Sequence, residues 1–259
     1  MKIKKGNWVL FFSPGKAKFI KKIEGDRFST HLGEIDLKKV LEKEYGEVIE
    51  TSKKEPLYLL KPLTEDLSMN VKRTTTIIYP KDAGYMILRA GVKSGDVVFE
   101  VGTGSGALTY ILSTIVGKNG RVYSFEKRKE FLENARKNLE NLDVKNVKLI
   151  ERDVEKEGFG RRNADAVFVD IPEPWKVVWA AWDALKGGAC WVSLNPNIEQ
   201  IKKTTKELKK MGFTRIEVFE ILLREVLVRK EGTRPKERMV SHTGYLLFAQ
   251  KITKPTQEK

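Results

Sequence analysis

The sequence predicts an α/β protein in which a small β-rich N-terminal domain precedes a mostly parallel β-sheet closed by an antiparallel hairpin. Three observations lead to this prediction. After residue 70, strand-like apolar segments alternate with helical ones, as in a parallel sheet with helices on both faces. Before residue 70 the chain consists mainly of short strand-like segments between turns. The last two apolar stretches are long enough to pair as a closing hairpin.

The first predicted domain covers residues 1–70, with strand-like segments at 8–12, 18–23 and 57–63. Ser-Pro-Gly, Glu-Gly-Asp and Lys-Glu-Pro sequences mark turns in this part of the chain. Residues 36–45 are expected to form one short helix. Residues 64–70 are expected to be a linker to the second domain, 71–259.

The second domain is predicted to hold a sheet with helices between its strands. Strands are expected at 96–101, 121–126, 147–153, 164–170 and 189–194, and helices at 107–116, 129–142 and 198–211. Residues 216–229 and 243–252 are expected to be the two long strands of the closing hairpin. The basic segment 229–239 lies between them.

The charge balance is the most informative part of the composition. Among 259 residues, 49 Lys and Arg stand against 35 Asp and Glu, which gives a net charge of +14. Such an excess favours a polyanionic partner, most often nucleic acid; the alternative is the lysine-rich surface of a heat-adapted protein. The sequence has one cysteine, no apolar run of membrane-spanning length and no proper signal peptide. We therefore expect a cytoplasmic protein with no membrane partner.

A glycine-rich turn follows the first strand of the predicted parallel sheet. Gly102, Gly104 and Gly106 lie between this strand and a helix, where glycine lets a ligand approach the backbone closely. The spacing is G-x-G-x-G, whereas a dinucleotide site favours G-x-G-x-x-G. Glu100 precedes the first glycine by two residues.

Acidic residues follow at the next two strand ends. Glu126 ends the second strand and could accept hydrogen bonds from both hydroxyls of a ribose; the alternative is an ordinary exposed glutamate. Asp153 ends the third strand and could accept from an adenine amino group, or simply cap a helix. Together with the glycine turn, they resemble the class I S-adenosylmethionine-dependent methyltransferases, which have a Rossmann-like sheet.

The fourth strand ends at Asp170, where this superfamily commonly places substrate-facing residues. Pro172 and Pro174 restrict the loop that follows, so the carboxylate of Asp170 is held in a fixed direction. Trp175 would line the pocket or stack on a base; the alternative is that it packs beneath the loop.

The motifs VDIPEPW, TTTIIYPKDAGYMI, EVGTGSGALT and SHTGYLL together resemble the tRNA (adenine-N1)-methyltransferases of the T-loop, over the whole chain. This resemblance implies adenosine 58 as the target, with 57 also modified in archaeal members, and a homotetramer. It implies that Asp170 binds the target base and is the catalytic residue. The implied cofactor-binding residues are Ile77, Tyr79, Glu100, Gly102, Gly104, Ser105, Gly106, Ala107, Leu108, Glu126, Lys127, Asp153, Val154 and Asp170.

Basic residues near the closing hairpin are candidates for contacts with tRNA phosphates. They are Arg224, Arg229, Arg234, Lys236 and Arg238. The alternative is that they form a solvated surface. His242 could touch the substrate or make a structural hydrogen bond, and neither histidine has a metal-ligand partner in the sequence, so no metal is expected.

Three other functions fit parts of these patterns. The first is methylation of another RNA, a protein or a small molecule. The second is a non-catalytic tRNA-binding subunit, which would be favoured by loss of the glycine turn or of Asp170, and both are intact. The third is aminopropyl transfer on the same fold, which would require an acidic polyamine site.

Overall fold

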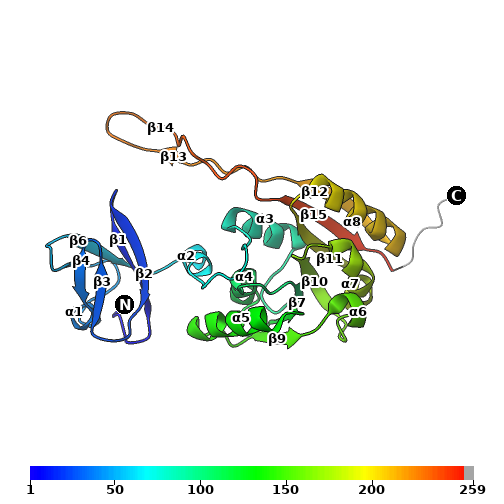
Figure 1. Ribbon diagram of the computed structural model, residues 1–259, viewed down its shortest axis with the longest axis horizontal. Coiled ribbons are helices and arrows are strands. Elements are labelled where there is room, and N and C mark those ends of the chain that lie inside the picture. Colours follow the sequence, from blue (N-terminus) through cyan, green and yellow to red (C-terminus); the bar gives the residue numbers. More distant parts are fainter. Residues whose placement is uncertain (254–259) are drawn as a thin grey trace. The chain divides into compact units, whose positions relative to one another are not determined.

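The computed structural model describes residues 1–253, which form two compact units: Met1–Asn70 and a second that begins at Val71 (Figure 1). Each unit has its own hydrophobic core. Among the described residues, none of the helices has the length and apolar character needed to cross a lipid bilayer.

The first unit is built on a four-stranded antiparallel sheet with the order β2-β1-β6-β5. Its strands are β1 (Trp8–Ser13), β2 (Ala17–Lys22), β5 (Val48–Glu50) and β6 (Pro56–Leu60). A separate hairpin joins β3 (Arg27–Thr30) to β4 (Gly33–Asp36). Fully buried Phe11, Ile35 and Leu57 belong to one core cluster. Strands β3, β4 and β5 were not predicted, because their apolar residues are too few to stand out.

Two predictions for this unit need correction. The helix expected at 36–45 is only α1 (Leu37–Leu41). The expected linker at 64–70 contains a helix, α2 (Thr64–Met69). This helix starts there because the Asp66 carboxylate accepts the Leu63 N–H at 2.9 Å, and it is also paired with Lys18 at 2.7 Å. These contacts are local capping and a long-range ion pair, which composition alone does not reveal.

The second unit contains a seven-stranded sheet with the order β12-β15-β11-β10-β7-β8-β9. The strands are β7 (Val97–Val101), β8 (Arg121–Glu126), β9 (Val147–Glu151), β10 (Ala164–Val169), β11 (Leu185–Asn195), β12 (Phe213–Phe219) and β15 (Tyr245–Lys251). The pairs from β11 to β9 are parallel, and β15 is antiparallel to both neighbours. The prediction of a mostly parallel sheet is confirmed, with β15 as its antiparallel strand.

Helices cover both faces of this sheet, because alternate residues of its buried strands point to opposite sides. The elements are α3 (Pro80–Ala90), α4 (Ala107–Val116), α5 (Lys129–Asn141), α6 (Val154–Glu157), η1 (Pro174–Val177), α7 (Val178–Ala184) and α8 (Ile198–Met211). Val98 and Phe168 pack with α3 and α4, whereas Phe99 and Val167 pack with α7 and α8.

The predicted closing hairpin is only partly correct. Strand β12 pairs with β15 as far as Phe219, opposite Leu246. Beyond this point the chain leaves the sheet, and residues 220–243 form an excursion that we call the arm. Its tip is a separate ribbon of β13 (Val226–Leu227) and β14 (Arg234–Pro235) (Figure 1). The sheet strand β15 begins only at Tyr245, so the largely apolar segment 221–228 has no strand of the sheet to pair with.

Candidate active site

A cavity of about 330 Å³ lies at the carboxyl ends of β7 and β10. From β7 the chain adds strands β8 and β9 on one side of the sheet, and from β10 it adds strands on the other side, so the strand order reverses between β7 and β10. This is the position where open α/β sheets bind ligands. The segment before α3, residues 72–79, forms part of its wall, and we call it the strap. The remaining wall comes from the glycine turn and the ends of β8, β10 and β11.

The glycine turn is needed for close passage of the chain. Gly102 has φ of 92°, and a Cβ added there would lie 2.1 Å from the carbonyl oxygen of Asp170. Gly104 has φ of 53°, and its added Cβ would lie 2.8 Å from the hydroxyl of Thr75 in the strap. Glycine at these two positions therefore lets the loop of Asp170 and the strap lie directly against the turn. The sequence pattern alone did not reveal this constraint.

Three carboxyl groups face this cavity. Glu100 is buried and accepts hydrogen bonds from the hydroxyls of Thr109 and Ser124, each at 2.6 Å. Burial raises the pKa of Glu100 to about 7. Burial also raises the pKa of Asp170 to about 6, with a smaller contribution from the charge of Glu126. A cavity with three carboxyl groups favours a cationic ligand, which would relieve their mutual repulsion.

Glu126 is held in place by its neighbours. Its carboxylate accepts the N–H of Gly104 at 3.3 Å, and the backbone N–H and guanidinium of Arg128 at 3.1 and 3.3 Å. Glu126 also lines a second cavity of about 300 Å³ that shares its wall with the first. The two cavities together can take an elongated ligand with Glu126 near its middle.

The structure brings most of the predicted cofactor residues to these two cavities. The first is lined by Ile77, Glu100, Gly102, Gly104, Ser105, Ala107, Leu108, Glu126 and Asp170. The second is lined by Gly102, Glu126, Lys127, Asp153 and Val154. Asp153 also accepts the Glu155 N–H at 3.2 Å as the N-cap of α6, so its alternative role as a helix cap is real. Gly106 and Tyr79 lie outside both linings, as the N-caps of α4 and α3.

The predicted substrate-binding residues lie elsewhere. Trp175 belongs to η1, with the ammonium group of Lys203 4.7 Å from its ring centre. The five basic residues from Arg224 to Arg238 are all in the arm. Some have partners within it: Lys236 pairs with Glu225 at 2.6 Å, and Arg234 with Glu237 at 2.9 Å.

Sequence reasoning missed several residues of the site, among them Arg128 and Gln200. Arg128 lines both cavities; its place two residues after Glu126 could have indicated it. Gln200, in α8, lines the first cavity and donates to the carbonyl of Pro172 at 2.9 Å, so it supports the loop that follows Asp170. No sequence signal links Gln200 to that loop, because the contact depends on how α8 packs.

Asparagines of α5 fasten the strap to the glycine turn. The side chain of Asn138 accepts the N–H of Lys72 at 3.1 Å and donates to the carbonyls of Lys72 and Ser105 at 3.0 and 2.9 Å. Asn134 donates to the same Lys72 carbonyl at 2.9 Å. The hydroxyl of Ser105 in turn accepts the N–H of Thr74 at 3.0 Å. One turn of α5 thus fixes the position of the strap.

No group of three or more His, Cys, Asp and Glu side chains that could hold a metal ion occurs in the described part of the chain.

Comparison with known proteins gives consistent matches. TrmI of Methanocaldococcus jannaschii, a tRNA (adenine(57)-N1/adenine(58)-N1)-methyltransferase, is 38% identical, with 93% of each chain covered. TrmI of Thermus thermophilus, a tRNA (adenine(58)-N1)-methyltransferase, is 34% identical over 90% of this chain and 92% of its own.

Solved structures agree with this. The tRNA (m1A58) methyltransferase TrmI of Aquifex aeolicus superposes with a TM-score of 0.86 at 32% identity, covering 98% of this chain and 100% of its own. A SAM-dependent O-methyltransferase of Thermotoga maritima gives 0.92 at 40% identity, covering 99% and 97%. The family model of the tRNA methyltransferase complex GCD14 subunit matches residues 56–234. The chain belongs to this tRNA methyltransferase family and has its class I, Rossmann-like fold.

Proposed function

We propose that this protein transfers a methyl group from S-adenosylmethionine to N1 of an adenosine in the T-loop of tRNA, at position 58 and, as in the archaeal relative, at 57. The observation that carries the proposal is the placement of Asp170 in the cavity formed with the glycine turn and Glu126. It is supported by 38% identity over 93% of both chains to a relative with that activity.

The donor set of the two cavities suits S-adenosylmethionine. The three carboxyl groups would balance its sulfonium and ammonium charges, and Glu126, between the cavities, would accept from ribose hydroxyls. Asp153 and Val154 in the second cavity would hold the adenine ring. When bound, this cofactor supplies an electrophilic methyl group.

Asp170 would orient the substrate base. Adenine N1 carries a lone pair, so no base is needed to remove a proton from it. A carboxylate that accepts a hydrogen bond from the N6 amino group would fix the ring and stabilise the positive charge that develops on it. Because N1 lies on the Watson–Crick edge, the adenosine must be unpaired or flipped out to reach the cavity.

Methylation of an oxygen atom is the second candidate, because the Thermotoga maritima protein at 40% identity is described as an O-methyltransferase. A hydroxyl acceptor must lose a proton, so Asp170 would then act as a general base. The chemical position of the transferred methyl group separates the two reactions.

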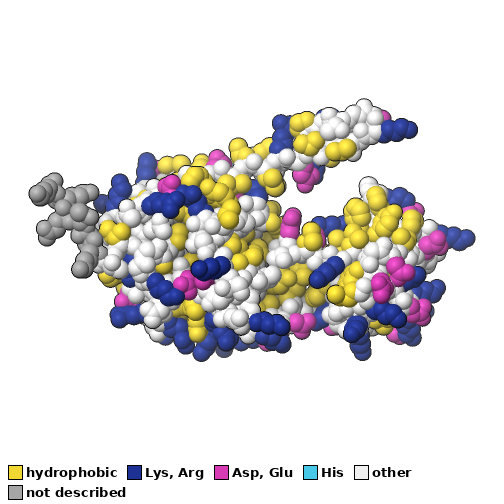
Figure 2. Space-filling view, turned by 180° about the vertical axis from the view of Figure 1, so that it is seen from behind, with side chains coloured by type: hydrophobic (Ala, Val, Ile, Leu, Met, Phe, Trp, Pro, Cys, Tyr) yellow, Lys and Arg dark blue, Asp and Glu magenta, His cyan; other side chains and the backbone are white. Residues whose placement is uncertain are grey.

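The basic surface supports a polyanionic substrate. Lys and Arg side chains are spread over the face shown in Figure 2, and the net charge is +14. We assign Arg224, Arg229 and Arg238 of the arm to phosphate contacts, because they are exposed. Arg234 and Lys236 would have to exchange their acidic partners for phosphates.

We assign catalysis to residues 71–259 and an accessory role to the β-rich residues 1–70. We further propose a cytoplasmic homotetramer from a heat-adapted cell. Its support is the lysine-rich composition and the apolar surface of the arm, which a partner chain would cover. The exposed apolar residues of the arm include Leu222, Leu223, Val226, Val228 and Val240.

The first prediction concerns the reaction. Incubation of unmodified tRNA with methyl-labelled cofactor, followed by nucleoside mapping, should place the label on N1 of a T-loop adenosine. Label on an oxygen atom, or no transfer to tRNA, would contradict the proposed function.

Asp170→Ala should reduce the single-turnover rate by on the order of a hundredfold, the scale for loss of one preorganised electrostatic partner. Asp170→Asn should recover part of this, because an amide oxygen still accepts the hydrogen bond.

The same reaction should depend on pH. Because the pKa of Asp170 is raised to about 6, its carboxylate is lost as the pH falls through that value, and the single-turnover rate should fall with it. This acid limb should be absent in Asp170→Asn. An unchanged limb in that variant would assign the titration to another group.

The second prediction concerns the strap. Asn138→Ala removes three hydrogen bonds that fix Lys72 and Ser105, and should weaken S-adenosylmethionine binding by about tenfold, equivalent to roughly 1.4 kcal/mol. Asn146→Ala is the matched control, since it also removes two bonds to carbonyls, those of Ser113 and Gly117, away from the cavity. Calorimetric titration should show weaker binding for the first variant only.

The third prediction concerns tRNA. Arg229→Ala combined with Arg238→Ala should weaken tRNA binding and lower the slope of affinity against salt by roughly one unit per lost phosphate contact. Lys5→Ala with Lys54→Ala, in the other unit, serves as a charge-matched control. If affinity and slope stay the same in the arm variant, these arginines belong to the solvated surface.

The fourth prediction concerns assembly. Light scattering should give four times the chain mass of 29.6 kDa. Replacing Leu222, Leu223 and Val226 by Ser should reduce the particle mass, because the apolar contact is removed, while the circular dichroism spectrum stays unchanged. A wild-type protein that scatters as a monomer would contradict the tetramer.

A further inference from the structure

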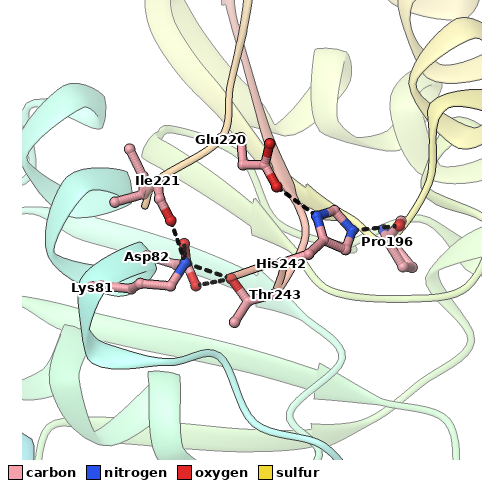
Figure 3. Close-up of polar contacts among 7 residues, drawn as sticks. All are labelled: Lys81, Asp82, Pro196, Glu220, Ile221, His242 and Thr243. Atoms are coloured by element: carbon pink, nitrogen blue, oxygen red, sulfur yellow. Dashed lines mark hydrogen bonds and ion pairs between the residues drawn. The ribbon is translucent and has the colours of Figure 1, made fainter. Parts of the chain in front are cut away.

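The base of the arm carries polar side chains with no part in the proposed chemistry. The chain leaves β12 through Glu220 and Ile221, and returns to β15 through His242 and Thr243 (Figure 3). Figure 3 shows these two segments side by side. Ile221 and Thr243 both contact the first turn of α3, and His242 contacts Pro196.

On the α3 side the contact is a buried ion pair. The ammonium group of Lys81 donates to Asp82 at 2.8 Å, to the carbonyl of Ile221 at 2.7 Å and to the hydroxyl of Thr243 at 2.6 Å. That hydroxyl donates to the other oxygen of Asp82 at 2.7 Å. Asp82 has no exposed surface, so loss of either charge would leave the other buried and unpaired. This pair fixes both segments at the base of the arm.

On the other side, His242 bridges two acceptors. Its Nδ1 lies 2.7 Å from Oε1 of Glu220, and its Nε2 lies 3.1 Å from the carbonyl oxygen of Pro196. An ionised carboxylate and a carbonyl accept hydrogen bonds and donate none. With Glu220 ionised, both contacts are hydrogen bonds only when both ring nitrogens carry hydrogen, that is, when the side chain is an imidazolium.

The surroundings of His242 favour that charged form. The hydrogen bond to Glu220, then that to Pro196, raises the pKa of His242, while the nearby charge of Lys81 opposes this. From β15 the ring of Tyr245 packs against the imidazole, with ring centres 4.9 Å apart. Asp82 also lies at the base of the arm, and it is paired with Lys81.

A short chain of contacts leads from His242 to the cavity. Pro196 lines the cavity. The next residue, Asn197, caps α8 by accepting the N–H of Gln200 at 3.0 Å. Gln200 also lines the cavity and donates to Pro172, two residues after Asp170. The wall held by His242 is thus the wall that supports the loop of Asp170.

We propose that His242 is a positioning residue, which as an imidazolium holds the Pro196 carbonyl and thereby the cavity wall that supports the Asp170 loop. The inference rests on the proposed methyl transfer. When the pH rises through the pKa of His242, the neutral ring keeps one N–H, so one of its two contacts is lost. The contribution of a raised histidine pKa is present at lower pH and disappears as the pH rises.

The charge of His242 can be measured without any substrate. The sequence has only two histidines, His31 and His242, so His31→Gln leaves a single imidazole signal in an NMR titration. We expect the pKa of His242 above its usual value, and a decrease towards that value in Glu220→Gln. A pKa of His242 at or below the usual value in the wild type would overturn the proposal.

The positioning role is tested by single-turnover methylation of unmodified tRNA over a range of pH. The wild-type rate should fall on the alkaline side with the pKa found by NMR. His242→Gln should be slower by on the order of tenfold, the effect of a slightly displaced loop, and should lack this alkaline limb, while S-adenosylmethionine binding is unchanged. His31→Gln is the control and should match the wild type.

The outcomes separate the two proposals. If the wild type does not methylate tRNA, the proposed function fails, and the NMR titration still decides the charge of His242. If tRNA is methylated and His242→Gln keeps the wild-type rate and pH profile, the positioning role is wrong and His242 only stabilises the arm.

Discussion

The site depends on the close approach of two chain segments, at the ends of β7 and β10. The carbonyl of Asp170 lies where a side chain at position 102 would begin, 2.1 Å from the Cβ that any residue other than glycine would carry. Because β7 and β10 are neighbours in the parallel sheet, this close approach is held by the hydrogen bonds of the sheet, including the one from the Asp170 N–H to the Val101 carbonyl at 2.9 Å. The position of the Asp170 backbone is therefore set by the sheet at the core of the unit.

Burial gives the carboxyl groups different properties. Glu100 is enclosed and receives two hydroxyl hydrogen bonds, yet burial still raises its pKa to about 7. Glu126 instead receives two backbone N–H groups and a guanidinium, which stabilise a negative charge. The carboxylates of such a cavity repel one another, and a bound cation relieves this repulsion. The same interaction therefore both binds the ligand and selects for its positive charge.

The sequence predicted the sheet and the positions of its strand ends, because period and spacing are local properties of the chain. Gly102, Glu126 and Asp170 could be found as the residues that follow apolar runs. Asn138 and Gln200 could not, because their roles come from the packing of α5 and α8 against distant loops. The first part of the arm, residues 220–229, was predicted to continue the strand that begins at 216, because many of its residues are apolar. An exposed apolar segment and a buried strand have the same local composition.

The arm has a consequence for how members of this family can diverge. Its contacts with the rest of the unit are concentrated at the base, at Ile221, His242 and Thr243. The residues between them can be inserted, deleted or exchanged without moving a strand of the sheet or a wall of the cavity. Changes at the tip of the arm would therefore alter which partners it contacts, whereas changes at the base would disturb the paired charges of Lys81 and Asp82 and the contacts that lead to the cavity.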